Sequence, residues 1–170
     1  MLATAAEATG ADLKNTVYMD LKYGRVVIEL HPELAPKNVA QVEKLIRAHF
    51  YDGTPFWRVI AGFMAQGGDP TGTGTGGSKL ADLPAEFTGR AEFLRGTVGM
   101  ARTNDPNSAN SQFFICLAPA TFLDGKYTII GQVVQGMQYV DEIKKGGGQN
   151  GKVTDPDRII RMRMADQASN

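Results

Sequence analysis

The sequence is short of the residues that most metal and cofactor sites require, and it carries no excess charge. Cys116 is the only cysteine, so an internal disulfide and a cysteine-cluster metal site are both excluded. Lysine plus arginine and aspartate plus glutamate each number 18, which gives a formal net charge of zero. Nucleic acid and anionic membranes are therefore not expected as partners. No apolar run approaches the roughly 18 residues of a membrane-spanning helix.

Histidine is equally scarce. His31 and His49 are the only two, and neither belongs to an HxxxH or HExxH pattern. A zinc site is therefore not expected. No G-x-S-x-G sequence surrounds Ser108 or Ser111, so no motif supports a hydrolase. We expect neither a metal ion nor any other cofactor in this protein.

Length and composition fit one compact domain. The chain has 170 residues, of which 42% are hydrophobic, and this is enough to bury a sizeable core. We expect the domain to span residues 15–165, with a flexible lead-in at 1–14 and a short tail at 166–170. Residues 1–14 lack the basic and apolar regions of a signal peptide, although the remnant of a cleaved one would look similar. Both a cytoplasmic and a periplasmic location stay open, and Cys116 is expected to be a buried small hydrophobe.

Short strand patterns outnumber helical ones. Apolar and polar residues alternate over 16–23 and again over 25–30, which predicts a hairpin. Helices are predicted over 36–50 and 138–145. About eight strands and two helices that do not alternate along the chain favour an antiparallel barrel with helices at its ends. The other strand-like segments are 55–60, 62–66, 96–101, 112–117, 127–134 and 158–164.

A glycine-rich stretch, GGDPTGTGTGGSK at 67–79, contains the spacing G-x-G-x-x-G. That spacing binds phosphate where it joins a strand to a helix. Here Pro84 disfavours a following helix, and Ser78 occupies the place of a Walker lysine. The sequence therefore disfavours nucleotide binding, and two interpretations remain: a flexible surface loop, or a loop that lines a peptide groove.

Three blocks carry a resemblance to a known family: FWRVIAGFMAQGGD at 56–69, NSANSQFFIC at 107–116 and FLDGKY at 122–127. They resemble the cyclophilin family of peptidyl-prolyl cis-trans isomerases, and its bacterial members in particular, over about residues 16–164. The resemblance implies a mainly β fold, a closed eight-stranded antiparallel β-barrel capped by two α-helices. It also implies an enzyme that rotates X–Pro peptide bonds and assists protein folding as a chaperone does, with a groove on the outer face of the barrel.

The same resemblance assigns roles to individual residues. Arg58 matches the catalytic arginine, and Gln66 and Gln112 match polar residues beside it. The other substrate-binding positions that it implies are the proline-pocket walls Phe63, Met64, Phe114 and Leu123, the backbone-binding segment Ala101, Arg102 and Thr103, the loop at Gly74–Gly77 that edges the neighbouring pocket, and Phe122 and Tyr127.

Four positions depart from the most familiar eukaryotic members. Trp57 and Tyr127 stand where histidines are usual, and Arg102 replaces an asparagine. Phe122 replaces a tryptophan whose indole N–H contacts cyclosporin A in the family. Because phenylalanine has no such donor, cyclosporin A is expected to be a weak ligand, while the isomerase should stay active.

The implied reaction suits a sequence without a nucleophile, because it breaks no bond. A guanidinium at Arg58 stays charged and can donate to the amide nitrogen as the X–Pro bond twists. The expected partners are proline-containing polypeptides, and the protein is expected to be a monomer. The alternative is a binding module that holds prolyl peptides as a chaperone or docking site. The presence of Arg58 together with all four pocket walls favours catalysis.

Overall fold

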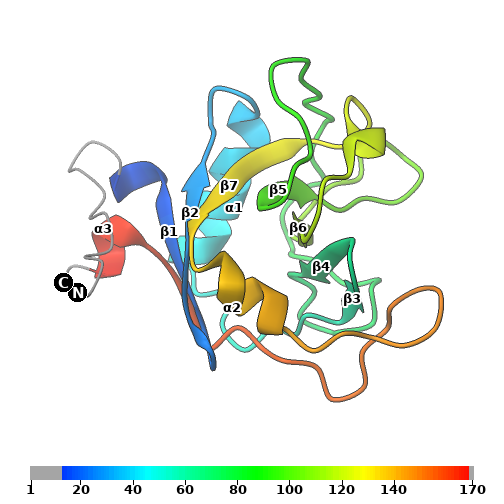
Figure 1. Cartoon of the computed structure of the whole chain (residues 1–170). Coiled ribbons are helices and arrows are strands. Elements are labelled where there is room, and N and C mark those ends of the chain that lie inside the picture. Colours follow the sequence, from blue (N-terminus) through cyan, green and yellow to red (C-terminus); the bar gives the residue numbers. More distant parts are fainter. Residues whose placement is uncertain (1–12, 169–170) are drawn as a thin grey trace.

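The computed structural model describes residues 13–168 (Figure 1). Residues 1–12 and 169–170, which hold most of the expected lead-in and the end of the expected tail, lie outside the described residues. Each of the eight segments expected to contain a strand does so. In chain order the elements are η1 (Leu13–Asn15, a 3-10 turn), β1 (Thr16–Leu21), β2 (Gly24–Leu30), α1 (Pro36–Arg47), β3 (Arg58–Ile60), β4 (Met64–Gly67), β5 (Thr97–Met100), β6 (Phe113–Cys116), η2 (Thr121–Leu123, a 3-10 turn), β7 (Ile129–Gln135), α2 (Met137–Glu142), β8 (Arg161–Met164) and α3 (Ala165–Ala168).

The strands form one antiparallel sheet in the order β3-β4-β6-β5-β7-β2-β1-β8. It curls strongly (Figure 1), but the expected closed barrel is wrong, because no ladder joins β3 to β8 among residues 13–168. The free edge of β3 is occupied instead by the chain at 151–153, where Val153 donates to the carbonyl of Trp57 at 2.9 Å and Val59 donates to that of Gly151 at 2.8 Å. The segments that precede β3 and β8 meet at the isolated bridge Pro55–Arg158.

The helices are shorter than the sequence patterns predict. The stripe of α1 buries Val39, Val42, Leu45 and Ile46. The predicted extension to residue 50 is wrong, because His49 has a left-handed φ of 64°, which a right-handed helix cannot continue.

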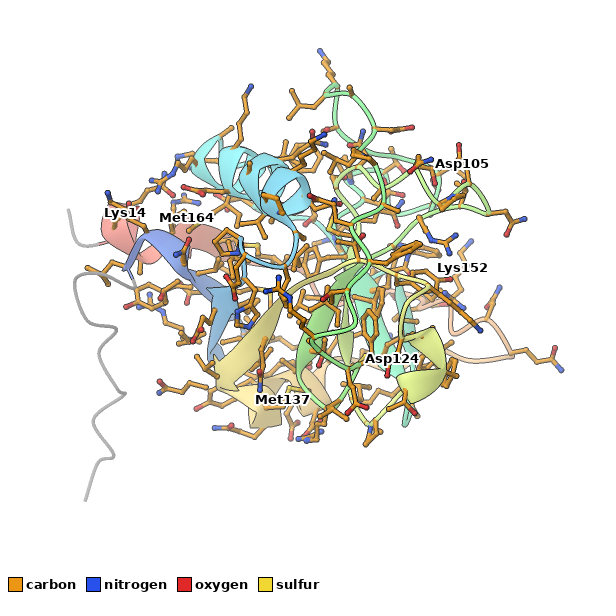
Figure 2. The ribbon with its side chains drawn as sticks, turned by 90° about the horizontal axis from the view of Figure 1, so that it is seen from above. Lys14, Asp105, Asp124, Met137, Lys152 and Met164 are labelled. Atoms are coloured by element: carbon orange, nitrogen blue, oxygen red, sulfur yellow. The ribbon has the colours of Figure 1, made fainter. Side chains whose placement is uncertain are left out.

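The predicted extension of the second helix to residue 145 is also wrong. This helix, α2, ends at Glu142, and the backbone becomes extended at the buried Ile143. Figure 2 places α1 at one end of the curled sheet and Met137, the first residue of α2, at the other. The third helix, α3, is not predicted and falls where a tail is expected. No helix within residues 13–168 has the length and apolarity needed to cross a bilayer.

Strands β4 and β6 are buried on both faces, and their alternate residues belong to different hydrophobic clusters. Ala65 and Ile115 belong to the main core, which fills the inside of the curl and packs on α1. Met64, Phe114 and Cys116 belong to a second cluster. Successive side chains of a strand point to opposite faces of the sheet. The second cluster therefore lies on the face of β4 and β6 that is turned away from the main core.

Candidate active site

Strand register brings the predicted catalytic residue and two predicted substrate-binding residues into one row. Arg58 on β3 is the direct partner of Gln66 on β4, and Gln66 is in turn the partner of Phe114 on β6. Directly paired side chains in an antiparallel sheet lie about 4.5–5.5 Å apart at Cβ and point to the same face. The sheet therefore sets an arginine, an amide and an aromatic ring side by side on the face of the second cluster.

The guanidinium of Arg58 is held at two atoms. Its Nη1 donates to Oε1 of Gln66 at 3.2 Å, and its Nε donates to the backbone carbonyl of Asn150 at 2.7 Å. Asn150 belongs to the segment that lies beside β3, so the chain that occupies this sheet edge also supports the arginine. The side chain is half-buried, and its remaining N–H groups make no hydrogen bond to residues 13–168.

Gln112, just before β6, continues the polar contacts from Gln66. Its Oε1 accepts hydrogen bonds from Nε2 of Gln66 at 3.1 Å and from the indole Nε1 of Trp57 at 3.0 Å. Its Nε2 donates to the backbone carbonyls of Gly74 and Gly76, both at 3.0 Å. The structure thus joins both predicted amide residues to the arginine and to the glycine-rich loop.

The four predicted walls of the proline pocket lie in the second hydrophobic cluster. Met64, Phe114 and Leu123 are buried, and Phe63 packs against them with part of its ring in solvent. Phe122 is 63% exposed, and its ring centroid lies 5.5 Å from that of Phe63. These residues form an apolar surface beside Arg58.

Tyr127 and Arg102 border this surface on another side. The Tyr127 ring meets that of Phe114 edge-on at 5.8 Å, and the Arg102 guanidinium lies 4.5 Å from the centroid of the Tyr127 ring. Nη2 and Nε of Arg102 donate to the backbone carbonyl of Lys126 at 2.6 and 3.1 Å. Arg102 therefore ties its own segment to the loop that carries Tyr127.

Sequence reasoning missed two residues beneath the apolar surface. Phe93 is fully buried and stacks on Phe114 at 5.6 Å. Gly99 leaves room for this pair, because a Cβ there would lie 2.6 Å from both rings. A glycine inside the strand pattern at 96–101 is a signal of close approach that could have indicated this packing.

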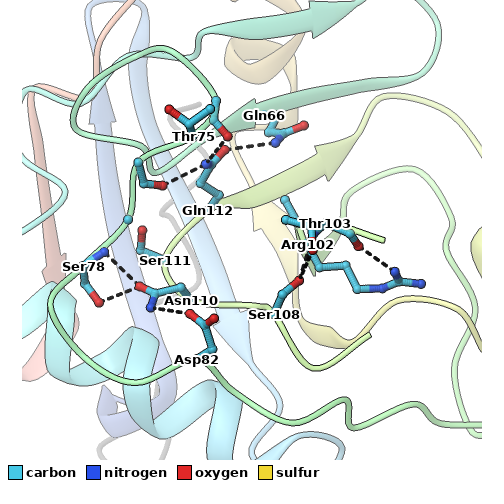
Figure 3. Close-up of a pocket in the computed structure, with 14 residues that line it drawn as sticks. Gln66, Thr75, Ser78, Asp82, Arg102, Thr103, Ser108, Asn110, Ser111 and Gln112 are labelled. Carbon is cyan, nitrogen blue, oxygen red and sulfur yellow. Dashed lines mark hydrogen bonds between the residues drawn. The ribbon is translucent and has the colours of Figure 1, made fainter. Parts of the chain in front are cut away.

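A hollow of about 440 Å³ lies next to Gln66 and Gln112 (Figure 3). Much of its wall consists of predicted substrate-binding residues, namely Gln66, Gly74, Ala101, Arg102, Thr103 and Gln112. Arg58 and the apolar walls are not among its lining residues, so the two predicted parts of the site are adjacent and share Gln66.

Other residues that line the hollow are polar and were not predicted individually. Asn110 accepts hydrogen bonds from the backbone N and the hydroxyl of Ser78 at 2.9 and 2.6 Å, and its Nδ2 donates to Asp82 at 3.0 Å (Figure 3). The hydroxyl oxygen of Ser108 accepts a hydrogen bond from the backbone N–H of Thr103 at 2.9 Å. Asn110 and Ser108 belong to the NSANSQFFIC block. Their amide and hydroxyl groups were the sequence signal from which a place in the site could have been predicted.

The glycine-rich loop is organised around Asp69, which is fully buried. Oδ1 accepts from the backbone N and the hydroxyl of Thr71 at 2.8 and 2.7 Å. Oδ2 accepts from the backbone N of Gly74 and of Gly76 at 2.7 and 3.1 Å. Burial raises the pKa of Asp69, but these hydrogen bonds from Thr71, Gly76 and Gly74 outweigh it and hold the pKa below its usual value.

The structural context of a phosphate-binding loop is missing. The chain passes from β4 directly to β5 with no helix between them, so no helix N-terminus faces the glycines. Of the two interpretations left open by the sequence, the loop that lines a groove agrees with its place in the wall of the hollow.

Comparison with known proteins decides the family. A family model described as "Cyclophilin type peptidyl-prolyl cis-trans isomerase/CLD" matches residues 16–164. The chain belongs to the cyclophilin family. A probable peptidyl-prolyl cis-trans isomerase of Brucella suis is 54% identical to it, over 91% of this cyclophilin and 84% of the relative. A peptidyl-prolyl cis-trans isomerase-like protein of Homo sapiens is 42% identical, over 75% and 78% of the two chains.

Solved cyclophilin structures share the fold. A cyclophilin from Hirschia baltica superposes with a TM-score of 0.79 at 30% identity, covering 90% of this chain and 74% of that one. A cyclophilin from Cryptosporidium parvum, crystallised in the presence of the dipeptide Ala-Pro, gives a TM-score of 0.80 at 30% identity, covering 88% and 98%. The cyclophilin identity predicted from three sequence blocks is confirmed, and with it the isomerase class of the enzyme.

The single cysteine of this cyclophilin, Cys116, packs in the hydrophobic interior. Cys116 is fully buried in the second cluster, as the sequence predicted. Burial, with a smaller contribution from Asp124, raises the pKa of its thiol to about 12. A thiol is a nucleophile only as the thiolate, so burial keeps Cys116 in its unreactive thiol form at neutral pH.

Proposed function

We propose that this cyclophilin accelerates rotation about X–Pro bonds by aiming the guanidinium of Arg58 at the twisted prolyl amide. The supporting observation is the double support of Arg58 by Gln66 and Asn150, directly beside an apolar cluster. The cluster of Met64, Phe114 and Leu123, with Phe63 at its edge, holds the pyrrolidine ring. The residue before proline then rotates while the ring stays fixed.

The chemistry requires charge placement rather than bond making. Resonance gives the planar amide a rotation barrier of roughly 18–20 kcal/mol. When the bond twists, the nitrogen lone pair leaves resonance and becomes a better hydrogen-bond acceptor. A donor fixed where that lone pair appears stabilises the transition state more than the ground state. A millionfold acceleration corresponds to about 8 kcal/mol of barrier, at roughly 1.4 kcal/mol per tenfold.

Arg58 supplies part of this stabilisation. A charge-assisted hydrogen bond contributes about 1.5–3 kcal/mol. The remainder comes from the apolar walls, which exclude water and bind the twisted form selectively. Gln66 and Asn150 hold the guanidinium before substrate arrives, so little reorganisation is needed at the moment of reaction.

The substrates are proline-containing polypeptides, and the protein acts on them as a monomer during folding. Residues that precede the X–Pro pair occupy the hollow of about 440 Å³ beside Gln66. Ala101, Arg102 and Thr103 form the wall between the hollow and Tyr127 and bind the peptide backbone. The cellular compartment, cytoplasm or periplasm, does not change these contacts.

The test is prolyl-peptide exchange measured for the wild type and for Arg58→Ala. We expect kcat/KM to fall by roughly a hundredfold or more, the loss seen when one transition-state donor is removed. Arg25→Ala is the matched control, because the exposed Arg25 pairs with Asp20 at 2.8 Å and lies over the ring of Tyr18, neither of which is a predicted site residue. Arg25→Ala should keep wild-type activity. Equal rates in the wild type and in Arg58→Ala would contradict the proposal and favour the binding module.

A further inference from the structure

The amide of Gln112 has only one orientation that satisfies its surroundings. Its oxygen faces two donors, Nε1 of Trp57 at 3.0 Å and Nε2 of Gln66 at 3.1 Å. Its nitrogen faces two acceptors, the carbonyls of Gly74 and Gly76 at 3.0 Å. Turning the amide over would set N–H against N–H and oxygen against oxygen. The indole N–H of Trp57 and the two glycine carbonyls cannot reverse their roles, so these three contacts specify which end of Gln112 points toward Gln66.

This orientation decides how Gln66 meets Arg58. Since Nε2 of Gln66 donates to Gln112, its Oε1 is the atom left to face Nη1 of Arg58 at 3.2 Å. An inverted Gln66 would turn an NH₂ group toward a guanidinium that has only donors. Because Gln66 is buried, bulk water does not replace a hydrogen-bond partner that its amide loses. The acceptor offered to Arg58 thus depends on Gln112.

Two features hold Gln112, one of them a residue to which the sequence assigned no role in the site. The first is Trp57, the only tryptophan of the chain, whose indole N–H is the donor to Oε1. The second is the glycine-rich loop, which supplies both carbonyls and which Asp69 fixes through four hydrogen bonds. The two are also in contact, because a Cβ on Gly74 would lie 2.6 Å from Cη2 of Trp57.

We propose that Trp57 is a positioning residue for the isomerase reaction: its indole N–H, together with the carbonyls of Gly74 and Gly76, sets the amides of Gln112 and Gln66 so that an oxygen faces Arg58. Trp57 does not touch the substrate nitrogen in this role; it acts through the two glutamines. The inference rests on the proposed catalytic role of Arg58 and adds to it the source of the arginine's orientation.

The test removes the N–H while keeping the ring. Because Trp57 is the only tryptophan, replacement of tryptophan by β-(3-benzothienyl)alanine exchanges the N–H for sulfur at this position alone. Trp57→Phe is the second, genetically encoded variant. We expect kcat/KM for a prolyl tetrapeptide to fall about three- to tenfold, the range of one hydrogen bond to a neutral acceptor. The fall should be in kcat, because the apolar surface that binds proline is unchanged.

A second background separates positioning from general damage to the fold. In Arg58→Ala the same replacement at Trp57 should change kcat/KM by less than about twofold, because residues that act as a unit are not additive. Tyr23→Phe is the matched control: it deletes one aromatic donor, to the carboxylate of Asp157 at 2.8 Å, which within residues 13–168 otherwise meets only Lys22 and Lys144 and no predicted site residue. It should keep wild-type kcat and lose thermal stability.

The outcomes are distinct. Full activity of the benzothienyl protein would overturn the role of Trp57 and leave that of Arg58 intact. An equal loss in the wild-type and Arg58→Ala backgrounds would also overturn it, since Trp57 would then act on structure and not through the arginine. Undiminished activity of Arg58→Ala alone would instead overturn the proposed catalytic role of Arg58.

Discussion

A Cβ atom on Gly74 would lie 2.6 Å from Cη2 of Trp57, so the backbone of the glycine-rich loop and the indole ring are in direct contact. Gly74 also has a φ of 92°, a region that residues with a side chain rarely adopt. Glycine is therefore required here for two reasons, the backbone conformation and the space that Trp57 fills.

Gly74→Ala should be more damaging than the same change at a glycine with open space. Gly53 has a similar φ of 76°, but a Cβ added there would meet no atom within 4 Å. Gly53→Ala should therefore cost about 1–2 kcal/mol of unfolding free energy, the backbone strain alone. Gly74→Ala should cost more and should also lower kcat/KM, because Trp57 must move. Urea unfolding and peptide exchange measure both; equal effects at the two positions would contradict this account.

Asp69 should make the stability of this cyclophilin depend on pH in the acid range. Its pKa is depressed in the folded protein, so its contribution is present above the unfolded value of about 3.9 and is lost as pH falls through the folded value. Asp69→Asn should lower the unfolding free energy at pH 7 by about 1–3 kcal/mol, because an NH₂ group would face N–H donors.

The difference between wild type and Asp69→Asn should begin to shrink as pH falls below about 4, because the carboxylate of the unfolded chain takes up a proton there. It should go on shrinking until the pH passes the depressed pKa of the folded protein, where the folded carboxylate is protonated as well. Guanidinium unfolding at a series of pH values measures it. Asp105→Asn, on an exposed residue of another loop, is the control and should follow the wild type. A constant difference across the acid range would show that the charge of Asp69 is not what holds the loop.

Cys116 should be inert in the folded protein. Burial raises the pKa of its thiol to about 12, and only the thiolate reacts with disulfide reagents. At about pH 8 a coloured aromatic disulfide should label no thiol in the native state and one thiol per chain after denaturation. Rapid labelling of the native protein would show that the second cluster opens readily.

Phe122→Trp should strengthen inhibition by cyclosporin A. Phe122 is 63% exposed beside Phe63 and has no N–H to offer. By resemblance to the family, a tryptophan here donates to the drug, and one hydrogen bond corresponds to about a three- to tenfold gain in affinity. Competition assays on both proteins measure it. Low-nanomolar inhibition of the wild type would show that the missing indole donor is unimportant.

Local patterns predicted most of the elements, because short-range chemistry determines them. Alternation gave the hairpin of β1 and β2, and the apolar stripe gave α1. The ends of both helices were wrong because a tertiary setting decides them: His49 turns left-handed, and Ile143 leaves α2 to pack in the core. Barrel closure was wrong because it depends on which segment occupies the edge of β3, a contact between distant parts of the chain.

The candidate site, like the fold, was only partly predictable from the sequence. The sequence blocks placed Arg58, Gln66 and Gln112, and the structure brings these three together. The blocks did not reveal the support from Asn150, which lies 92 residues away from Arg58 in the chain. They also did not reveal that Asp69 organises the glycine-rich loop. Asn150 lies in a loop and Asp69 makes its hydrogen bonds within one, and the path of a loop cannot be predicted from a periodic pattern.

The two-sided burial of β4 and β6 has a consequence for how this enzyme can diverge. Ala65 and Ile115 face the interior, whereas Met64 and Phe114 face the proposed proline site, and the backbone of the strands separates the two sets. Substitutions on the outer face can therefore alter substrate preference without disturbing the interior packing. Met64 and Phe114 are themselves buried, so a library randomised at the more exposed Phe63 and Phe122 should yield folded variants most often. This makes the domain a suitable scaffold for directed evolution of peptide recognition.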